Sequence, residues 1–190
     1  MLRVINFFFD TSLKALKLKP IKNPQCELKV ISDSEFAGDR DTQISVYGYV
    51  TYYYGAPISW KSKAGKSVTL SSTEAEYYAS SEAAKELVFV KNLVESIGIK
   101  FSTECRLMVD NTGAIYLANN YTTGRRTKHI DIRAHFVREK IVEEVFKVNF
   151  IKSAENDADI MTKNVGEDLF VLHSNKLLED LLEQLLIHIT

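Results

Sequence analysis

The segment Leu70-Ser-Ser-Thr-Glu-Ala-Glu-Tyr77 is the most informative part of the chain about its fold, because the sequence pattern changes there from strand to helix. Before it, runs of β-branched and aromatic residues predict three strands; after it, apolar residues recur every three or four positions. Ser and Thr followed by Glu are typical of a helix start. We therefore expect a long helix from residue 72 to about residue 97, ended by Gly98.

Outward from this helix, the predicted order is three strands, helix, strand, two helices, strand and helix. The expected strands cover residues 28–36, 43–54, 58–62 with 68–70, 105–110 and 145–151, and the expected shorter helices cover residues 112–119, 130–143 and 156–163. Terminal helices are expected over residues 1–19, before a proline-marked linker, and over residues 167–188. The predicted fold class is α/β: a five-stranded mixed sheet flanked by helices, with extra N- and C-terminal helices.

The composition is typical of a soluble globular domain. The chain has 190 residues, 45% of them hydrophobic and 26% charged, which suffices for one domain with a core. Its net charge is −1, so a polyanionic partner must be met by local Lys and Arg residues. Cys26 and Cys105 show no metal-ligand spacing and are expected to be free thiols. No apolar run approaches membrane-spanning length, so no membrane partner is expected.

Helix periodicity separates the two acids of the opening segment. The apolar positions of the long helix are spaced by three or four residues: Ala79, Ala83, Leu87, Val90, Val94 and Ile97. Three residues before Ala79 lies Glu76, which therefore shares the inward stripe, whereas Glu74 is rotated from it by about 200°. We expect Glu74 to be a solvated first-turn acid and Glu76 to point at the sheet. The alternative for Glu76 is an accidental boundary position near the helix end.

Three other acids stand at the ends of expected elements. Asp33 interrupts an apolar strand, Asp110 ends another, and Asp159 lies at the start of a late helix. Each has an ordinary interpretation: a strand-end turn residue, a helix N-cap, and an N-cap partner of Asn156. Gathered with Glu76 at the strand ends, however, these carboxylates would repel one another unless metal ions neutralised them. An all-oxygen ligand set suits Mg²⁺ or Mn²⁺ better than Zn²⁺.

Six segments in one order carry a family resemblance. They are Ser32-Asp-Ser-Glu-Phe-Ala-Gly-Asp39, Gly55-Ala-Pro-Ile-Ser-Trp-Lys-Ser-Lys63, Leu70-Ser-Ser-Thr-Glu-Ala-Glu-Tyr77, Val109-Asp-Asn111, Arg126-Thr-Lys-His-Ile-Asp-Ile-Arg133 and Ala158-Asp-Ile-Met-Thr-Lys163. With them the chain resembles the ribonuclease H domain of copia-type retrotransposon Pol polyproteins, over roughly residues 28–165. Phe36 stands where that family often has Trp.

The resemblance implies a ribonuclease H-like fold, an activity and a site. Its catalytic and metal-binding acids would be Asp33, Glu76, Asp110 and Asp159, and its cofactors two Mg²⁺ (or Mn²⁺) ions. The implied reaction is hydrolysis of the RNA strand in an RNA–DNA hybrid, with two ions about 3.5–4 Å apart and Asp33 bridging them. The choice of Asp159 over Asp157 rests on the Ala-Asp pair of the family. Many cellular ribonucleases H have a product-release histidine in the loop that matches residues 152–156, and this chain has none there.

Polar and basic residues near these acids are candidates for binding the hybrid. The nucleic-acid-binding candidates are Trp60, Lys61, Ser62, Lys63, Ser72, Thr73, Asn111, Arg125, Arg126, Lys128 and His129. The ordinary alternatives are a solvated basic hairpin and a helix-capping Ser/Thr pair. For His129 we expect a structural or phosphate-contact role rather than product release.

The resemblance also implies a division of the chain. Residues 1–24 resemble the helix and linker that connect reverse transcriptase to ribonuclease H, residues 25–165 form the ribonuclease H domain, and residues 166–190 form a C-terminal helical extension. The reverse transcriptase domain of the same polyprotein is then an expected partner, and the cytoplasm (a virus-like particle) or the nucleus an expected location. The competing hypothesis is a catalytically silent module that keeps the fold and binds nucleic acid or acts as a scaffold.

Overall fold

The computed structural model describes residues 9, 11–39, 41–66, 68–120 and 128–181, without the side chains of residues 128–134. The strands are β1 (Lys14–Leu16), β2 (Leu28–Glu35), β3 (Val46–Tyr53), β4 (Ala56–Ala64), β5 (Arg106–Val109), β6 (Lys147–Phe150) and β7 (Leu178–Asp180). The helices are α2 (Ser72–Ser96), α3 (Thr112–Asn119), α4 (Lys128–Val142), the 3₁₀ turn η1 (Ser153–Glu155), α5 (Asp159–Thr162) and α6 (Glu167–Leu177). Within these ranges, no helix is both long and apolar enough to span a membrane.

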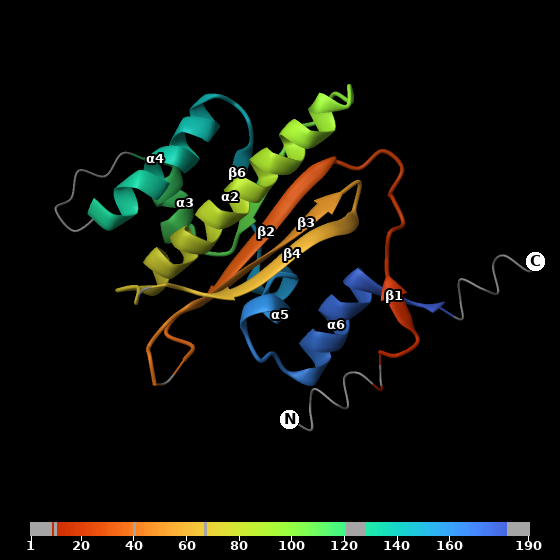
Figure 1. Cartoon of the computed structure of the whole chain (residues 1–190), viewed down its shortest axis with the longest axis horizontal. Helices are drawn as coiled ribbons and strands as arrows, with labels where there is room; N and C mark the ends of the chain where they lie inside the picture. The colour runs from red at the N-terminus through yellow and green to blue at the C-terminus, as the bar shows by residue number, and fades with distance from the viewer. Residues whose placement is uncertain (1–8, 10, 40, 67, 121–127, 182–190) are drawn as a thin grey trace, which may run out of the picture.

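The central sheet has five strands in the order β4-β3-β2-β5-β6 (Figure 1). Strands β2, β3 and β4 pair antiparallel, whereas β2, β5 and β6 pair parallel, so the sheet is mixed as predicted. The parallel half is the shorter, because β5 pairs with β2 only as far as Val109 opposite Ser32. The residue after that pair, Asp33, therefore lies beyond the carboxyl end of β5, where open α/β sheets place their ligands.

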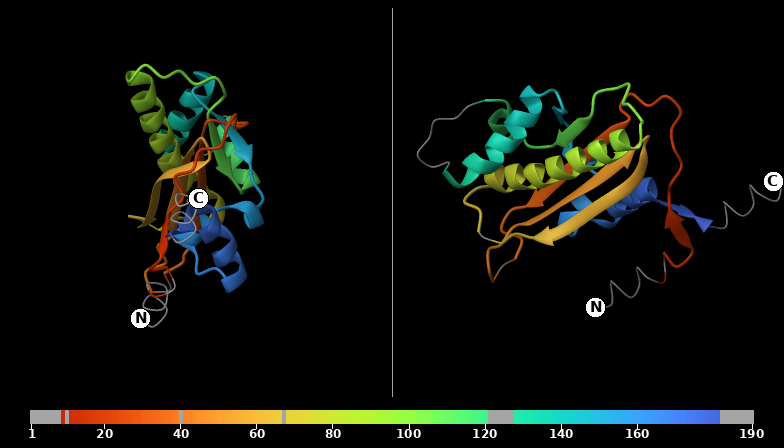
Figure 2. Two further views of the ribbon diagram at one scale, coloured as in Figure 1. Left: turned by 90° about the vertical axis from the view of Figure 1, so that its right-hand side faces the viewer. Right: turned by 45° about the horizontal axis from the view of Figure 1, so that its top comes forward.

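Helices cover both faces of the sheet (Figures 1 and 2). Alternation along β2 divides the apolar core in two: Val30 packs with the side of α2, α3 and α4, and Ile31 packs with the side of α5 and α6. The larger core contains Leu87 of α2 and Leu107 of β5, both fully buried. The candidate active site lies at the end of β5, between the layer of α2, α3 and α4 and the layer of α5 and α6.

The start of α2 confirms the predicted helix phase. Ser71 is the N-cap and accepts the Glu74 N–H at 3.1 Å, while the Glu74 carboxylate accepts the Leu70 N–H at 2.7 Å. This reciprocal capping keeps Glu74 at the helix start. Glu76, one half-turn later, is only 6% exposed. The predicted stripe is buried from Ala79 to Val94, but Ile97, next to the helix end, is exposed.

The chain ends differ from the sequence-based expectation. The helix expected over residues 1–19 is wrong at Lys14–Leu16, which form β1, and residues 1–8 and 10 lie outside the described part. The helix expected over residues 167–188 ends at Leu177, because Leu178–Asp180 form β7; residues 182–188 are not described. Strands β1 and β7 pair antiparallel, so each segment satisfies backbone groups of the other. Helix periodicity in one segment carries no information about this long-range pairing.

The third strand is also continuous where two pieces were expected. Strand β4 covers Ala56–Ala64, and residues 68–70 are not part of it. The buried hydroxyl of Thr69 lies 2.7 Å from that of Ser45. This contact joins the segment between β4 and α2 to the residue that precedes β3.

Candidate active site

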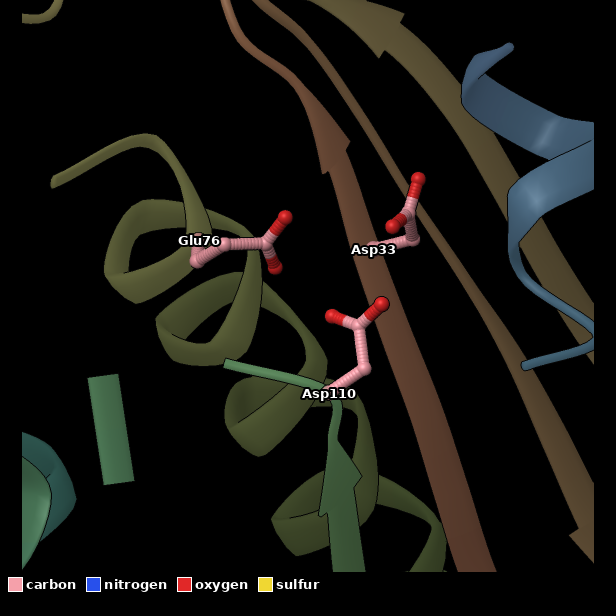
Figure 3. Close-up of side chains that lie close together, drawn as sticks. All are labelled: Asp33, Glu76 and Asp110. Carbon is pink, nitrogen blue, oxygen red and sulfur yellow. The ribbon is translucent and has the colours of Figure 1, made fainter. Parts of the chain in front are cut away.

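Three acids from three elements meet at the end of β5. Asp33 comes from β2, Glu76 from the first turns of α2, and Asp110 from the position directly after β5. One carboxylate oxygen from each lies within 4.8 Å of the other two, and Figure 3 shows the carboxylates around one space between α2, β2 and β5. Asp33 is fully buried and Glu76 nearly so, whereas Asp110 is partly exposed. The cluster is therefore open to substrate on the Asp110 side.

One oxygen of Glu76 is held by the protein and the other is not. The backbone N–H and the hydroxyl of Ser34 both donate to Oε1, at 3.1 and 2.8 Å. Oε2 is buried and has no hydrogen-bond donor among the described residues. Burial, reinforced by the Asp33 carboxylate, raises the pKa of Glu76 to about 8. A buried carboxylate oxygen without a donor, facing two other acids, fits a hard cation such as Mg²⁺.

Asp33 and Asp159 are joined through a lysine. Lys163 Nζ lies 2.7 Å from an Asp33 oxygen and 3.1 Å from an Asp159 oxygen, and the Thr162 hydroxyl donates to the second oxygen of Asp33. Burial raises the pKa of Asp33 to about 7, although Lys163 opposes that shift. Burial lowers the pKa of Lys163, but both carboxylates raise it more, so it stays above its usual value. The fourth predicted acid thus approaches Asp33 across an ammonium group, separate from the three-acid cluster.

The neighbour of Asp110 performs the capping role. Asn111 is the N-cap of α3, and its Oδ1 accepts the Ala114 N–H at 2.9 Å, so the N-cap interpretation of Asp110 is wrong. The Asp110 carboxylate instead accepts the Ser153 hydroxyl at 2.9 Å. Ser153 belongs to the loop that lacks the histidine of cellular ribonucleases H. The Asp110 side chain is thereby directed toward the cluster rather than toward the helix start.

The structure also separates Asp157 from Asp159. Asp157 is 4% exposed and its carboxylate accepts from Tyr52, His173 and Lys176, on the side of β3 and α6. Asp159 contacts Lys163 next to Asp33. The geometry therefore places Asp159, and not Asp157, near Asp33, with the Lys163 ammonium group between the two carboxylates.

The nucleic-acid-binding candidates of β4 do not form one surface. Successive strand residues face opposite sides. Trp60 lines an apolar cavity of about 450 Å³ with Met161 and Phe170, and Lys61 lies over the Tyr49 ring and 4.0 Å from Glu82 of α2. By register, Ser62 shares the Trp60 face, and Lys63 shares the Lys61 face. These four residues are thus divided between the two sides of the sheet.

The starts of α2 and α3 lie together. A Cβ atom built on Gly113 would be 3.1 Å from both the Thr73 hydroxyl and Asn111 Oδ1. Ser72 and Thr73 open α2, and Asn111 adjoins Asp110. This arrangement brings two of the nucleic-acid-binding candidates, Thr73 and Asn111, close together next to Asp110. Arg125 and Arg126 lie outside the described residues, and Lys128 and His129 are described only as backbone at the start of α4.

Sequence reasoning missed four side chains that hold the acids: Ser34, Ser153, Thr162 and Lys163. Ser34 and Ser153 carry no signal of their own, because serine is common in strands and loops. Lys163 was detectable, since it lies four residues after Asp159, a spacing at which opposite charges meet on a helix. Thr162 precedes it in the same quoted motif.

Comparisons with known proteins agree with this geometry. No protein-family model matches the chain. It is 41% identical over 145 residues to the retrovirus-related Pol polyprotein from transposon TNT 1-94 of Nicotiana tabacum, covering 76% of this chain and 11% of that protein. It is 33% identical over 175 residues to the Pol polyprotein from transposon RE1 of Arabidopsis thaliana, covering 92% of this chain and 12% of that protein. The chain thus spans only about a tenth of the length of these curated relatives.

Two solved structures have a fold similar to that of this chain. The structure of LC11-RNase H1, isolated from compost, superposes with a TM-score of 0.54 at 16% identity, over 72% of this chain and 92% of that one. The crystal structure of the same enzyme in complex with an RNA/DNA hybrid superposes with a TM-score of 0.53 at 15% identity, over 71% of this chain and 93% of that one.

The fold and the acidic cluster define a domain of the ribonuclease H-like class. Within that class, the chain is homologous to the Pol polyproteins of copia-type retrotransposons over most of its length. The resemblance inferred from the quoted motifs is therefore confirmed.

Proposed function

We propose that the chain is a divalent-metal-dependent endonuclease that hydrolyses the RNA strand of RNA–DNA hybrids during retrotransposon reverse transcription. The observation that carries this proposal is the meeting of Asp33, Glu76 and Asp110 oxygens within 4.8 Å, at the end of β5. The hybrid bound by LC11-RNase H1 and the Pol context of the relatives support the choice of substrate.

The three-acid cluster would hold one Mg²⁺ or Mn²⁺ ion, because its donors are all carboxylate oxygens. A second ion would lie between Asp33 and Asp159, where Lys163 now contributes the positive charge. When bound, the ions supply an activated water and a Lewis acid for the leaving oxygen. Two ions, with Asp33 shared between them, are part of the proposal.

The protein's own contribution is to orient the acids and admit the hybrid. Ser34 fixes Glu76, and Ser153 fixes Asp110. The substrate would approach over Asp110, between the adjoining starts of α2 and α3, where Thr73 and Asn111 offer polar contacts to a nucleic acid backbone. A reverse transcriptase domain of the same polyprotein is the proposed partner, and a virus-like particle in the cytoplasm, or the nucleus, the proposed location.

Cleavage of a labelled RNA–DNA hybrid in Mg²⁺ or Mn²⁺ tests this proposal. The unmutated chain should cut the RNA strand, and chelation should stop it. Asp110→Asn should lower cleavage by at least about 100-fold, because it removes a charged ligand but keeps the shape. Glu74→Gln is the matched control: it makes the same chemical change on α2 outside the cluster, and it should retain activity. An unmutated, folded chain that does not cleave would overturn the proposal.

One observation favours the catalytically silent alternative. Lys163 already compensates two of the four acids, Asp33 and Asp159, within the protein. A silent module would bind the hybrid with equal affinity in EDTA and in Mg²⁺, and it would leave both strands intact. The cleavage assay and a binding titration together distinguish the two functions.

A further inference from the structure

The turn that leads to Asp159 is anchored on its inner side. Asn156 is fully buried; its Nδ2 donates to the Ser32 carbonyl at 3.2 Å, and its Oδ1 accepts the Ala158 N–H at 3.0 Å. Ser32 directly precedes Asp33 in β2. This contact holds one end of the turn against the strand that carries the central acid.

The outer side of the same turn is held by Asp157. Its carboxylate accepts the Tyr52 hydroxyl at 2.9 Å and contacts His173 Nδ1 at 2.8 Å and Lys176 Nζ at 2.6 Å. Burial and the adjacent Asp157 charge raise the pKa of Tyr52, so its hydroxyl keeps the proton that it donates. We call His173, Lys176 and Tyr52 the Asp157 clamp.

His173 has no evident task other than this contact. It is fully buried in α6, and its Nε2 has no hydrogen-bond partner in the described part of the chain. A helix that only covered the sheet would be more stable with an apolar residue at this position, because an unpaired buried nitrogen costs free energy. The imidazole is therefore best explained by its bond to Asp157.

We propose that α6 positions the active-site acid Asp159 through this clamp. This inference rests on the proposed ribonuclease function. His173 and Lys176 are positioning residues: they hold Asp157, Asp157 fixes the turn, and the turn aims Asp159 at Asp33. Helix α6 would then support the active site rather than only cover the sheet.

Substitutions in α6 test the clamp. His173→Leu removes the bond to Asp157, whereas His173→Asn keeps a donor near the Nδ1 position. In folded protein, we expect His173→Leu to lower kcat by about 10- to 100-fold, since misplacing a reacting group by about 1 Å has effects of this size. KM for the hybrid should change little, and His173→Asn should restore most of the activity. Asn175→Ala, on the same helix with its side chain toward Lys14, is the control and should leave kcat unchanged.

A double-mutant cycle separates positioning from general damage. Residual cleavage is measured in Mn²⁺ under single-turnover conditions. In a chain that already carries Asp159→Asn, adding His173→Leu should not lower the cleavage rate further. If His173→Leu does not fold, Lys176→Met replaces it in the cycle, because Lys176 is partly exposed. Fully additive losses, or folded clamp variants with normal kcat, would overturn the clamp alone. A folded unmutated chain without any cleavage would overturn the proposed function, and the clamp's role with it.

Discussion

At the scale of single residues, the site concentrates buried carboxyl groups whose ionised forms have little compensation. Glu76 and Asp33 are almost inaccessible to water, and both have a raised pKa. Lys163 offsets part of the charge on Asp33, whereas among the described residues Glu76 receives only the two Ser34 donors. Such an arrangement is costly for folding and useful for binding a divalent cation.

The raised pKa values predict how stability depends on pH. Glu76 shifts from 4.5 to about 8 and Asp33 from 3.8 to about 7, so the folded chain binds more protons than the unfolded chain in this window. The free energy of unfolding in EDTA should therefore fall as the pH rises from about 4 to about 8, by on the order of 2 kcal/mol per pH unit. Urea unfolding at each pH measures it. Glu76→Gln should reduce the slope, and an unchanged slope in that variant would contradict the assignment.

The position of Lys163 predicts how its substitution changes the affinity for a metal ion. Its ammonium group lies between Asp33 and Asp159 and repels any cation that these acids attract. Lys163→Met should raise the affinity for Mn²⁺ by at least about tenfold, because two unit charges about 4 Å apart repel by about 1 kcal/mol even at the dielectric of water, and a divalent ion doubles this repulsion. Calorimetric titration measures it. Lys85→Met, which removes an exposed lysine paired with Glu82, should leave the affinity unchanged. Weaker Mn²⁺ binding by Lys163→Met would show that the lysine supports the site instead.

At the scale of elements, the site depends on how closely α5 approaches the sheet. Gly48 of β3 pairs with Asp33 of β2. A Cβ atom at Gly48 would lie 2.6 Å from Met161 Cβ and 2.8 Å from the Lys61 carbonyl, both too close for real contacts. The missing side chain thus lets α5, which begins with Asp159, lie directly over β3.

Gly48→Ala should therefore push α5 away from β3. We expect a loss of about 1–3 kcal/mol in the free energy of unfolding, as for other overpacked cores, together with slower hybrid cleavage. Thermal unfolding and the cleavage assay measure the two effects. Gly166→Ala is the control for a methyl group that meets no other atom, because φ at Gly166 is −61° and an added Cβ would meet nothing within 4 Å; it removes the glycine N-cap of α6, so a smaller loss than for Gly48→Ala is expected. Equal stability of the two variants would show that α5 adapts to the added methyl group.

At the scale of the whole molecule, charge is local rather than global. The net charge of −1 provides no general attraction for a nucleic acid. Binding of a hybrid must then use individual basic residues around the cluster. Lys63 is exposed near the end of β4, on the side of the sheet that faces α2.

The salt dependence of hybrid binding tests whether Lys63 contacts the nucleic acid. The dissociation constant for a hybrid should rise steeply with salt, and Lys63→Ala should reduce the slope of log K against log salt by about one, the effect of one lost phosphate contact. Fluorescence anisotropy in EDTA measures binding without cleavage. Lys147→Ala is the control, since Lys147 pairs with Glu104 at the β6 edge of the sheet. An identical slope for Lys63→Ala and the unmutated chain would remove Lys63 from the interface.

Local sequence patterns predicted the α/β class and the inward phase of Glu76. These follow from local periodicity, because a helix or strand with one buried face must repeat its apolar residues at 3.6 or 2 positions. The pairing of β1 with β7, the capping role of Asn111, and the opposite directions of Asp157 and Asp159 were decided only by the tertiary structure. Each depends on partners distant in sequence, such as His173 for Asp157 and Lys163 with Asp33 for Asp159. Periodicity carries no information about such partners, because a hydrogen bond between distant segments exists only after the chain has folded.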